Sequence, residues 1–203
     1  MKVLAIVGSP RKKSNTDILV DKVIEGISSV TEVDSEKIYI VDKKINYCTG
    51  CGFHLRQADK VSGKMCSQDD DMIGIHREMI EADALIFGTP VHMRTLSAPM
   101  LNFLTRSIPL LKMKPIFDEN GKIVSAEVNS LLKGKKVASV VSQGDPMAYS
   151  GALAIQVLAI NFTDLMMKYV GDLLSTGNIK RGMAAEREDE LKRAFELGVR
   201  IAS

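Results

Sequence analysis

The sequence predicts an α/β domain in which a parallel sheet carries helices on both of its faces. Three short apolar runs are each followed by a polar turn that contains glycine, which is typical of strands buried on both faces of a parallel sheet. Between such runs lie stretches with apolar residues at helical spacing. Strands and helices therefore alternate along the chain, the pattern of an α/β fold.

Size and composition suit a single domain, residues 1–203, because a chain of this length buries roughly 70% of its unfolded surface. The net charge of +2 does not indicate a nucleic acid or an anionic membrane as a partner. No apolar run is long enough to span a bilayer, and the first is too short for a signal peptide. We therefore expect a cytoplasmic protein whose three cysteines are thiols or metal ligands rather than disulfides.

The first expected strand and the turn after it are the most informative segment. Five apolar residues, Val3–Val7, are followed by Gly8 and by a basic, polar turn that ends at Thr16. An amphipathic helix then begins, with Ile18 and Leu19 as its first apolar residues. The free amides and the positive dipole end of a helix that starts here point at one spot. The segment therefore predicts an anion site.

The side chains of this turn narrow the class of ligand. Hydroxyls, an amide and an arginine charge all suit phosphate oxygens. Neither the glycine spacing of a dinucleotide fingerprint nor the Gly-Lys-Ser/Thr end of a P-loop is present. We therefore expect a site for one terminal phosphate; the alternative is a plain connection whose Ser14 or Asn15 caps the helix. The candidate phosphate ligands are Ser9, Arg11, Ser14, Asn15 and Thr16.

Four more strands and four more helices are expected to follow in alternation. The strands are expected at residues 35–41, 84–87, 135–142 and 169–174, and the helices begin near residues 72, 97, 151 and 184. Right-handed crossovers among five parallel strands predict a flavodoxin-like three-layer sandwich with the strand order 2-1-3-4-5. The ligand then lies at the carboxyl ends of strands 1, 3 and 4, where the polar turns 8–16, 89–94 and 142–149 would meet.

Residues 109–134 form an insertion in this pattern. Asn120-Gly121 lies between two apolar pairs, Ile116-Phe117 and Ile123-Val124, and this arrangement predicts a hairpin. Such a hairpin has little of its own domain to cover, and exposed apolar segments usually mark interfaces. We therefore expect a homodimer or a homotetramer; the alternative is a hairpin folded onto the edge of its own sheet.

An acidic triplet, Asp69–Asp71, precedes the helix expected from residue 72. Acidic residues at a helix start favour the helix dipole, so we expect the triplet to cap this helix. His76 lies within the same helix, and we expect it to be solvated or to take part in capping. Both features thus predict local helix stabilisation rather than chemistry.

Several segments are similar to those of a known family. They are GSPRKKSNT at 8–16, CTGCGFH at 48–54, CSQDDDM at 66–72, FGTPVHMRTLSAPMLNFLTRS at 87–107 and SGALAIQVLAINF at 150–162. With these segments the chain resembles the NAD(P)H-dependent FMN reductase family of flavodoxin-like proteins. The cysteine-containing segments resemble the branch of that family around the iron–sulfur flavoproteins.

The resemblance implies a non-covalently bound FMN, with its phosphate on the turn after the first strand and NAD(P)H as co-substrate. The isoalloxazine ring would be lined by Thr89, Pro90, Val91, His92 and Met93. The far side of the ring would be closed by Ser142, Gln143, Gly144 and Asp145. The family often has an aromatic residue where His92 stands, and the structural alternative for residues 89–93 is a plain turn with Met93 as core filler.

All three cysteines lie in the expected loop 42–68, which is long for a connection in a compact domain. In iron–sulfur flavoproteins four closely spaced cysteines at this place bind a [4Fe-4S] cluster. By this resemblance Cys48, Cys51, His54 and Cys66 could hold a cluster or a zinc ion. The gap before Cys66 is longer than in the family pattern. The alternatives are a reducible Cys48–Cys51 pair and buried thiols that pack the loop.

The implied function is that of an enzyme in which NAD(P)H reduces bound FMN and the electrons pass to a quinone, a flavin or a nitro- or azo-aromatic acceptor. Flavin hydride transfer needs no protein acid or base, so no catalytic residue is expected. One alternative is an electron carrier that a ferredoxin feeds through a cluster. Another is a phosphate-binding regulatory module without redox chemistry. In an oligomer, the insertion 109–134 would lie near the flavin of a neighbouring copy.

Overall fold

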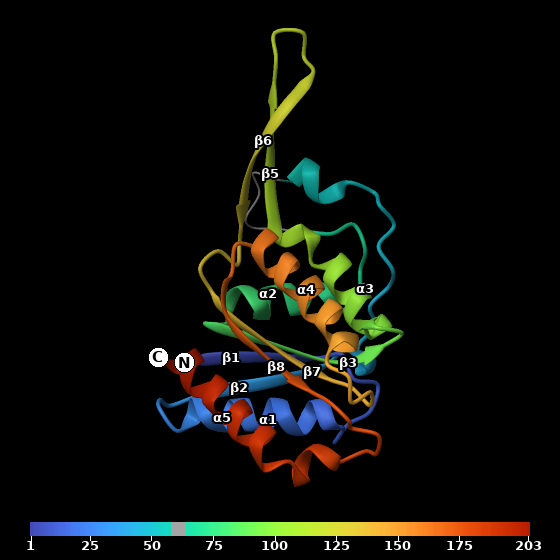
Figure 1. The fold of residues 1–203 in the computed structure, drawn as a ribbon. Coiled ribbons are helices and arrows are strands. Elements are labelled where there is room, and N and C mark those ends of the chain that lie inside the picture. The colour runs from blue at the N-terminus through green and yellow to red at the C-terminus, as the bar shows by residue number, and fades with distance from the viewer. Residues whose placement is uncertain (58–63) are drawn as a thin grey trace.

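The computed structural model describes residues 1–57 and 64–203, which form a sheet between two layers of helices (Figure 1). Five strands pair in parallel in the order β2-β1-β3-β7-β8, so the flavodoxin-like topology expected from the sequence is confirmed. The strands are β1 (Lys2–Val7), β2 (Asp34–Tyr39), β3 (Ala84–His92), β7 (Lys136–Ser142) and β8 (Lys168–Ser175).

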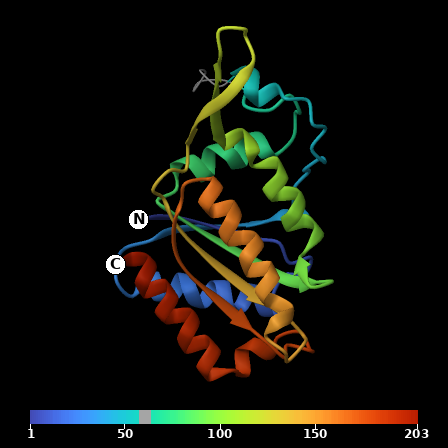
Figure 2. The same cartoon turned by 45° about the horizontal axis from the view of Figure 1, so that its top comes forward.

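Two helices cover one face of the sheet and three cover the other (Figures 1 and 2). The first pair is α1 (Asn15–Ser28) and α5 (Glu188–Ala202). The other layer holds α2 (Met72–Glu81), α3 (Ala98–Arg106) and α4 (Tyr149–Asp164). Short 3₁₀ helices occupy Ile40–Asp42 (η1), Phe53–Gln57 (η2), Ile108–Leu110 (η3) and Met183–Glu186 (η4). Among the residues described, no helix has the length and apolar character needed to cross a membrane.

The side chains of β1 point alternately to the two faces of the sheet, and each face has its own hydrophobic core. Leu4 and Ile6 pack with the layer of α2, α3 and α4, whereas Val3, Ala5 and Val7 pack with α1 and α5. Successive strand residues point to opposite faces, and a strand covered on both faces is therefore apolar throughout. This explains why the continuous run Val3–Val7 predicts a central strand.

Helices α1 and α5 cross at glycines. A Cβ atom added to Gly26 would lie 2.0 Å from the Phe195 carbonyl oxygen, and one added to Gly198 would lie 2.0 Å from the Val23 carbonyl oxygen. Neither position has room for a side chain while the two backbones stay where they are. The two helices therefore pack backbone against backbone, and this contact fixes α1, which begins at the predicted phosphate turn.

A short antiparallel strand that the sequence did not reveal, β4 (Thr95–Leu96), pairs with the end of β3. The connecting residues Met93 and Arg94 have φ values of 48° and 64°, as in the type I′ turns that join two-residue hairpins. Non-glycine residues seldom adopt positive φ, and such residues often occur at binding sites. This tight turn extends β3 beyond the sheet, at the edge where the ligand is expected.

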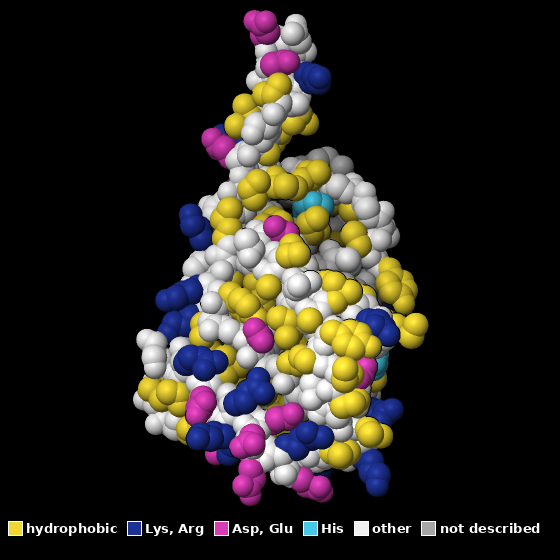
Figure 3. Space-filling model, viewed as in Figure 1, with side chains coloured by type: hydrophobic (Ala, Val, Ile, Leu, Met, Phe, Trp, Pro, Cys, Tyr) yellow, Lys and Arg dark blue, Asp and Glu magenta, His cyan; other side chains and the backbone are white. Residues whose placement is uncertain are grey.

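The predicted hairpin is confirmed, and its strands are β5 (Leu111–Phe117) and β6 (Ile123–Ser130). They form a separate two-stranded sheet that projects away from the helices as an arm (Figures 1 and 3). The alternative of a hairpin folded onto the edge of its own sheet is therefore wrong. We refer to residues 111–130 as the arm.

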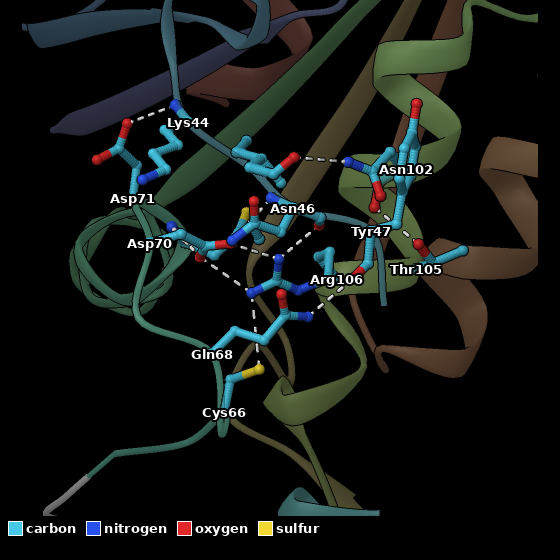
Figure 4. Close-up of polar contacts among 12 residues, drawn as sticks. Lys44, Asn46, Tyr47, Cys66, Gln68, Asp70, Asp71, Asn102, Thr105 and Arg106 are labelled. Carbon is cyan, nitrogen blue, oxygen red and sulfur yellow. Dashed lines mark hydrogen bonds and ion pairs between the residues drawn. The ribbon is translucent and has the colours of Figure 1, made fainter. Parts of the chain in front are cut away.

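A buried ion pair joins the cysteine-bearing segment to α3 (Figure 4). The Arg106 guanidinium donates to both carboxylate oxygens of Asp70, at 2.6 and 3.0 Å. The two side chains are 1% and 0% exposed. Arg106 also donates to the Asn46 carbonyl oxygen at 2.6 Å and to Cys66 Sγ at 3.6 Å. The guanidinium charge is thus paired inside the protein, where an unpaired charge would be strongly destabilising.

The acidic triplet takes part in this network, and only one of its members also caps α2 as expected. Asp71 makes no side-chain cap hydrogen bond to α2, and its Oδ2 accepts from the Lys44 amide at 2.7 Å. Asp70 does accept from the Met72 amide at 3.2 Å, but its shorter bonds are those from Arg106. Among the described contacts the capping expectation is therefore met by Asp70 alone. The ion pair was missed because nothing local in the sequence marks Arg106 as the partner of Asp70.

The expectation that His76 is solvated is wrong, and its capping contact is made to the end of α3 rather than to its own helix. The side chain is 1% exposed, and Nε2 donates to the Arg106 carbonyl oxygen at 2.8 Å. Desolvation lowers the pKa of His76 to about 4, so the ring is neutral at pH 7. The imidazole therefore satisfies a carbonyl near the end of α3, where no further helical turn supplies a donor.

We expect Asp70→Asn to lower the free energy of unfolding by about 3–5 kcal/mol, because it leaves the buried Arg106 charge without a counter-ion. Urea denaturation followed by circular dichroism measures the change. The control is Asp69→Asn, which makes the same change at the exposed neighbouring position and should stay within about 0.5 kcal/mol of the parent. Equal losses in the two variants would contradict the assignment.

Candidate flavin site

The turn after β1, the last residues of β3 and the end of β7 with the turn after it meet at one edge of the sheet and enclose a hollow of about 240 Å³. A fourth segment, which follows β8, closes it. This edge is the topological switch point, where β1 lies between β2 and β3 and where open α/β sheets bind ligands. The lining residues are Ser9, Pro10, Arg11, Ser14, Asn15, Thr16, Pro90, Val91, His92, Ser142, Gln143, Gly144, Asn178, Ile179, Lys180 and Arg181.

The start of α1 provides the anion-binding end of the hollow. Ser14 is the N-cap, and its Oγ accepts from the Asp17 amide at 3.3 Å. Ser9 Oγ accepts from the Arg11 amide at 3.2 Å and donates to the Arg11 carbonyl oxygen at 3.0 Å, which folds the turn. The first amides of a helix have no partner within it and carry the positive end of its dipole. A phosphate fits this end.

Asp17, which lies at the start of α1, stabilises the loop that precedes this helix. Lys13 has a φ of 53°, and its amide donates to Asp17 Oδ2 at 2.7 Å. Burial raises the pKa of Asp17, but hydrogen bonds from Lys37, the Lys13 amide and Tyr39 outweigh that effect and lower it. The carboxylate is therefore ionised, and its pairing with Lys37 at 2.8 Å offsets the repulsion that it would exert on a nearby phosphate.

Thr16 and Asn15 fasten the turn to the rest of the sheet edge. Thr16 Oγ1 lies 2.6 Å from Ser142 Oγ at the end of β7. Asn15 Nδ2 donates to the Lys180 carbonyl oxygen at 2.9 Å, and its Oδ1 accepts from the Ala184 amide at 3.0 Å. Asn15 thus lines the hollow, but its amide is engaged by the chain after β8 rather than free for a ligand.

On the β3 side, three of the five residues expected at the flavin ring line the hollow: Pro90, Val91 and His92. Thr89 is fully buried beneath them, where its Oγ1 donates to the Pro90 carbonyl oxygen at 3.0 Å. Met93 is 96% exposed at the tip of the turn, so it does not fill the core. Thr89 therefore lies beneath the residues that line this side of the hollow, and Met93 lies outside the hollow.

On the β7 side, Ser142, Gln143 and Gly144 line the hollow, whereas Asp145 does not. Asp145 accepts from the Met147 amide at 2.8 Å and from Ser150 Oγ at 2.6 Å. The side-chain amide of Gln143 donates to the carbonyl oxygens of Asp145 and Met147. These bonds hold the start of α4 next to the β7 side of the hollow.

The sequence-based prediction missed the wall that follows β8, formed by Asn178, Ile179, Lys180 and Arg181. Arg181 donates to the carbonyl oxygens of Lys12 and Lys13, so this segment is joined to the phosphate turn. A signal was available, because the carboxyl end of a fifth parallel strand must reach the same edge of the sheet. Gly177 and the basic pair Lys180-Arg181 lie within six residues of the end of that strand.

The four predicted metal ligands lie elsewhere, around a larger cavity of about 760 Å³ beside the base of the arm. Cys48, Cys51, His54 and Cys66 all line it, although part of the expected loop, residues 58–63, lies outside the described residues. In residues 1–57 and 64–203 no group of three or more His, Cys, Asp or Glu side chains is arranged to hold a metal ion. The metal site stays a prediction.

Cys51 is the exposed member of this set with a perturbed thiol. Its Sγ lies 3.0 Å from Ser67 Oγ. This contact, together with the Phe53 amide, lowers the pKa of Cys51 to about 7. About half of this thiol is therefore ionised near neutral pH, the state that binds metals and reacts with disulfides.

The fold and the site together define a flavodoxin-like protein with a cationic, amide-rich end and an adjoining wall at the switch point, where flavodoxin-like folds bind ligands. The family follows from comparison of sequences. Residues 1–180 match the model of the NADPH-dependent FMN reductase family, and the chain belongs to this family.

Curated relatives include iron-sulfur flavoproteins of Archaeoglobus fulgidus. One is 38% identical over 109 residues, which cover 54% of this chain and 46% of the relative, so the chain spans about half the length of that protein. Another is 29% identical over 185 residues, 90% of this chain and 80% of the relative.

Solved structures share the fold at low sequence identity. An NAD(P)H:quinone oxidoreductase from Methanothermobacter marburgensis has a TM-score of 0.70 and 16% identity, covering 100% of this chain and 98% of that one. An FMN-dependent NADH-azoreductase from Bacillus anthracis, solved with FMN, has a TM-score of 0.68 and 13% identity, covering 100% and 99%. At this identity the likeness concerns the fold alone.

The donor set of the hollow fits FMN. The amide-rich end offers helix amides, the Ser9 and Ser14 hydroxyls and the Arg11 guanidinium, and Lys180 and Arg181 also line the hollow. A phosphate carries close to two negative charges, which these cations match. Pro90, Val91 and His92 are extended strand, which suits the flat edge of a tricyclic ring.

We expect Arg11→Gln to weaken FMN binding by about 10–100-fold, because a hydrogen bond between charged groups contributes about 1.5–3 kcal/mol. Lys12→Gln is the matched control, since Lys12 is directed away to Asp42 at 2.6 Å; it should change the affinity by less than about threefold. Fluorescence titration of the apoprotein with FMN measures both.

Riboflavin, which lacks the phosphate, should bind the parent and Arg11→Gln proteins equally. An Arg11→Gln effect that is as large for riboflavin as for FMN would contradict the placement of the phosphate.

Proposed function

We propose that this protein is an FMN-dependent oxidoreductase that takes a hydride from NAD(P)H and passes electrons to a small organic acceptor. The observation that supports this most directly is the convergence of four strand-end segments on one hollow with a cationic, amide-rich end. Membership of the NADPH-dependent FMN reductase family supports the same activity.

Bound FMN would supply the redox chemistry, because it accepts a hydride and releases electrons singly or in pairs. The residues of this chain would bind and orient it. Ser9, Arg11 and Ser14 would hold the phosphate, the segment Pro90–His92 would position one side of the ring, and Gln143-Gly144 would close the other. These roles use the residues that line the hollow.

No side chain is proposed as a catalytic acid or base. Hydride transfer to a flavin needs none, and His92 is the one titratable residue on the ring wall formed by residues 90–92. We propose that His92 contacts the ring or the acceptor through a hydrogen bond. Main-chain amides near Gly144 would stabilise negative charge on reduced flavin, as preorganised donors do in other enzymes.

The acceptor that fits best is a flat aromatic molecule that stacks on the exposed ring, such as a quinone, a flavin, or a nitro- or azo-aromatic compound. Two proteins of the same fold are described as a quinone oxidoreductase and an azoreductase. The need for NAD(P)H and the free thiols both suit a reducing compartment, so we also propose a cytoplasmic location.

A second candidate is an electron carrier that receives single electrons from a ferredoxin through a [4Fe-4S] cluster. What favours it is that Cys48, Cys51, His54 and Cys66 all border one cavity, together with the relatives described as iron-sulfur flavoproteins. Iron and acid-labile sulfide analysis of protein purified without oxygen tests it. About four iron atoms per chain would support the carrier, and less than one would remove it.

We expect the purified protein to be yellow and its absorption band near about 450 nm to bleach when NADPH or NADH is added without oxygen. Stopped-flow absorbance measures the rate of bleaching. Fast bleaching by a nicotinamide supports the reductase, whereas bleaching by reduced ferredoxin alone supports the carrier. A colourless protein that also fails to take up FMN would overturn both.

A further inference from the structure

The larger cavity, of about 760 Å³, lies at the opposite end of α4 from the flavin hollow. The last turn of α4 lines the cavity, whereas the start of α4 adjoins the hollow through the bond from Ser150 to Asp145. The 16 residues of α4 extend about 24 Å, and no residue among those described lines both spaces. Small-molecule sites have volumes of roughly 300–1,000 Å³. The cavity is therefore a separate place of the right size for a second ligand.

Apolar side chains form most of the cavity wall. They come from α3, from η3 directly after it, from the base of the arm and from α4, and Figure 3 shows hydrophobic side chains gathered at the base of the arm. The main ones are Leu101, Leu104, Ile108, Leu111, Met113 and Val157. Removing apolar surface from water is favourable, so this wall suits a ligand with a hydrocarbon or aromatic body.

The hydroxyl groups on the α3 side of the cavity can only accept hydrogen bonds from a ligand. Thr105 Oγ1 donates to the Asn102 carbonyl oxygen at 2.8 Å (Figure 4). Ser107 Oγ donates to the Phe103 carbonyl oxygen at 2.9 Å. A hydroxyl has one hydrogen and two acceptor lone pairs, and both of these hydrogens are already engaged. Thr105 and Ser107, which line the cavity, therefore favour a ligand that donates.

The α4 side of the cavity adds an amide oxygen and a carboxylate. Asn161 Nδ2 donates to the Val157 carbonyl oxygen at 2.8 Å, and its Oδ1 is a further acceptor. Asp164 also lines the cavity and is exposed. None of the ion pairs within residues 1–57 and 64–203 involves Asp164. Its negative charge is thus available to a ligand.

Two helices end at the cavity. The last residue of α3 is Arg106 and the last residue of α4 is Asp164, and both line the cavity. The final carbonyl groups of a helix carry the negative end of its dipole, which favours a cation nearby. The two helix ends and the carboxylate together make this side of the cavity negative.

The positive charges near the cavity do not cancel this effect. Among the described lining residues, Arg106 is the one with a permanent positive charge, and its guanidinium is paired with buried Asp70 at 2.6 Å (Figure 4). Burial and the charge of Lys112 lower the pKa of His54, so this lining side chain is neutral at pH 7.5. Lys112 itself is next to Met113 in β5, and its side chain points to the opposite face of the strand.

We propose that this cavity is a binding site for an apolar amine that is protonated at neutral pH. The hydrocarbon or aromatic body of the amine packs against the apolar side chains of α3, α4 and the base of the arm. The ammonium group donates to the Asp164 carboxylate and to Asn161 Oδ1. An ammonium group has three donors and no acceptor, which matches a side of the cavity that offers acceptors. This site is additional to the redox activity and shares no described residue with the flavin hollow.

Three probes with the same aromatic body test the chemical class: 2-naphthylmethylamine, 2-naphthylmethanol and 2-naphthylacetate. Isothermal titration calorimetry at pH 7.5, with FMN in excess, measures their affinities for the parent protein. The amine should bind at least about tenfold more tightly than the alcohol, because a hydrogen bond between charged groups is stronger than a neutral one. The acetate should bind most weakly. An acetate that binds as tightly as the amine, or an amine that does not bind at millimolar concentration, would overturn the proposal.

The role of Asp164 is tested by Asp164→Asn, which keeps the shape of the side chain and removes its charge. The affinity for 2-naphthylmethylamine should fall about fivefold or more, and that for 2-naphthylmethanol by less than about twofold. Asp189→Asn is the control, because it removes the same charge from an exposed position at the start of α5. Equal effects of the two substitutions on the amine would refute the assigned contact.

The position of the probe is tested with two exposed leucines. Leu101 lines the cavity, whereas Leu153 lies on α4 outside it. Leu101→Trp fills part of the cavity and should weaken both the amine and the alcohol at least about fivefold, while Leu153→Trp should leave both affinities unchanged. Tight binding of the amine to the Leu101→Trp protein would place the probe elsewhere and overturn the proposal. Circular dichroism of both variants confirms that they are folded.

Discussion

The start of α1 is held by hydrogen bonds that tie four strand ends together, and the flavin site depends on them. Thr16 bonds to Ser142 at the end of β7, and Asn15 bonds to the chain that follows β8. Ser97 Oγ, beside the end of β3, donates to the Gly8 carbonyl oxygen at 2.7 Å. An anion site at a helix start is useful only if its amides stay aimed at one spot. These buried contacts provide that rigidity without using the amides themselves.

The strand order and the place of the site could be predicted because they follow from patterns that repeat along the chain. Buried strands such as Val3–Val7 are apolar throughout, and parallel strands must end at the same edge of the sheet. The N-cap role of Ser14 follows from helix-capping chemistry, which is local. The short strand β4 could not be found in this way, because two residues show no periodicity and its turn uses Met93 and Arg94 instead of glycine or asparagine.

Interactions between distant residues are what the sequence did not reveal. Arg106 and Asp70 are 36 positions apart, and each alone looks like an ordinary surface charge. The same applies to Asn15, whose amide fits phosphate chemistry but bonds to Lys180, 165 positions away. Side-chain type indicates which bonds a residue is able to make. Only the fold decides which of them it does make.

The glycine crossing of α1 and α5 has a consequence for how the cofactor site could vary among relatives. Gly26 lies near the far end of α1, and its Cα lies against the backbone of α5. A helix moves as a stiff rod, so a bulkier residue at this crossing would tilt α1 and displace its opposite end, where the phosphate turn lies. Affinity for the cofactor is thus coupled to how Gly26, two residues before the end of α1, packs against α5. A substitution there would change the affinity although no residue that touches the ligand has changed.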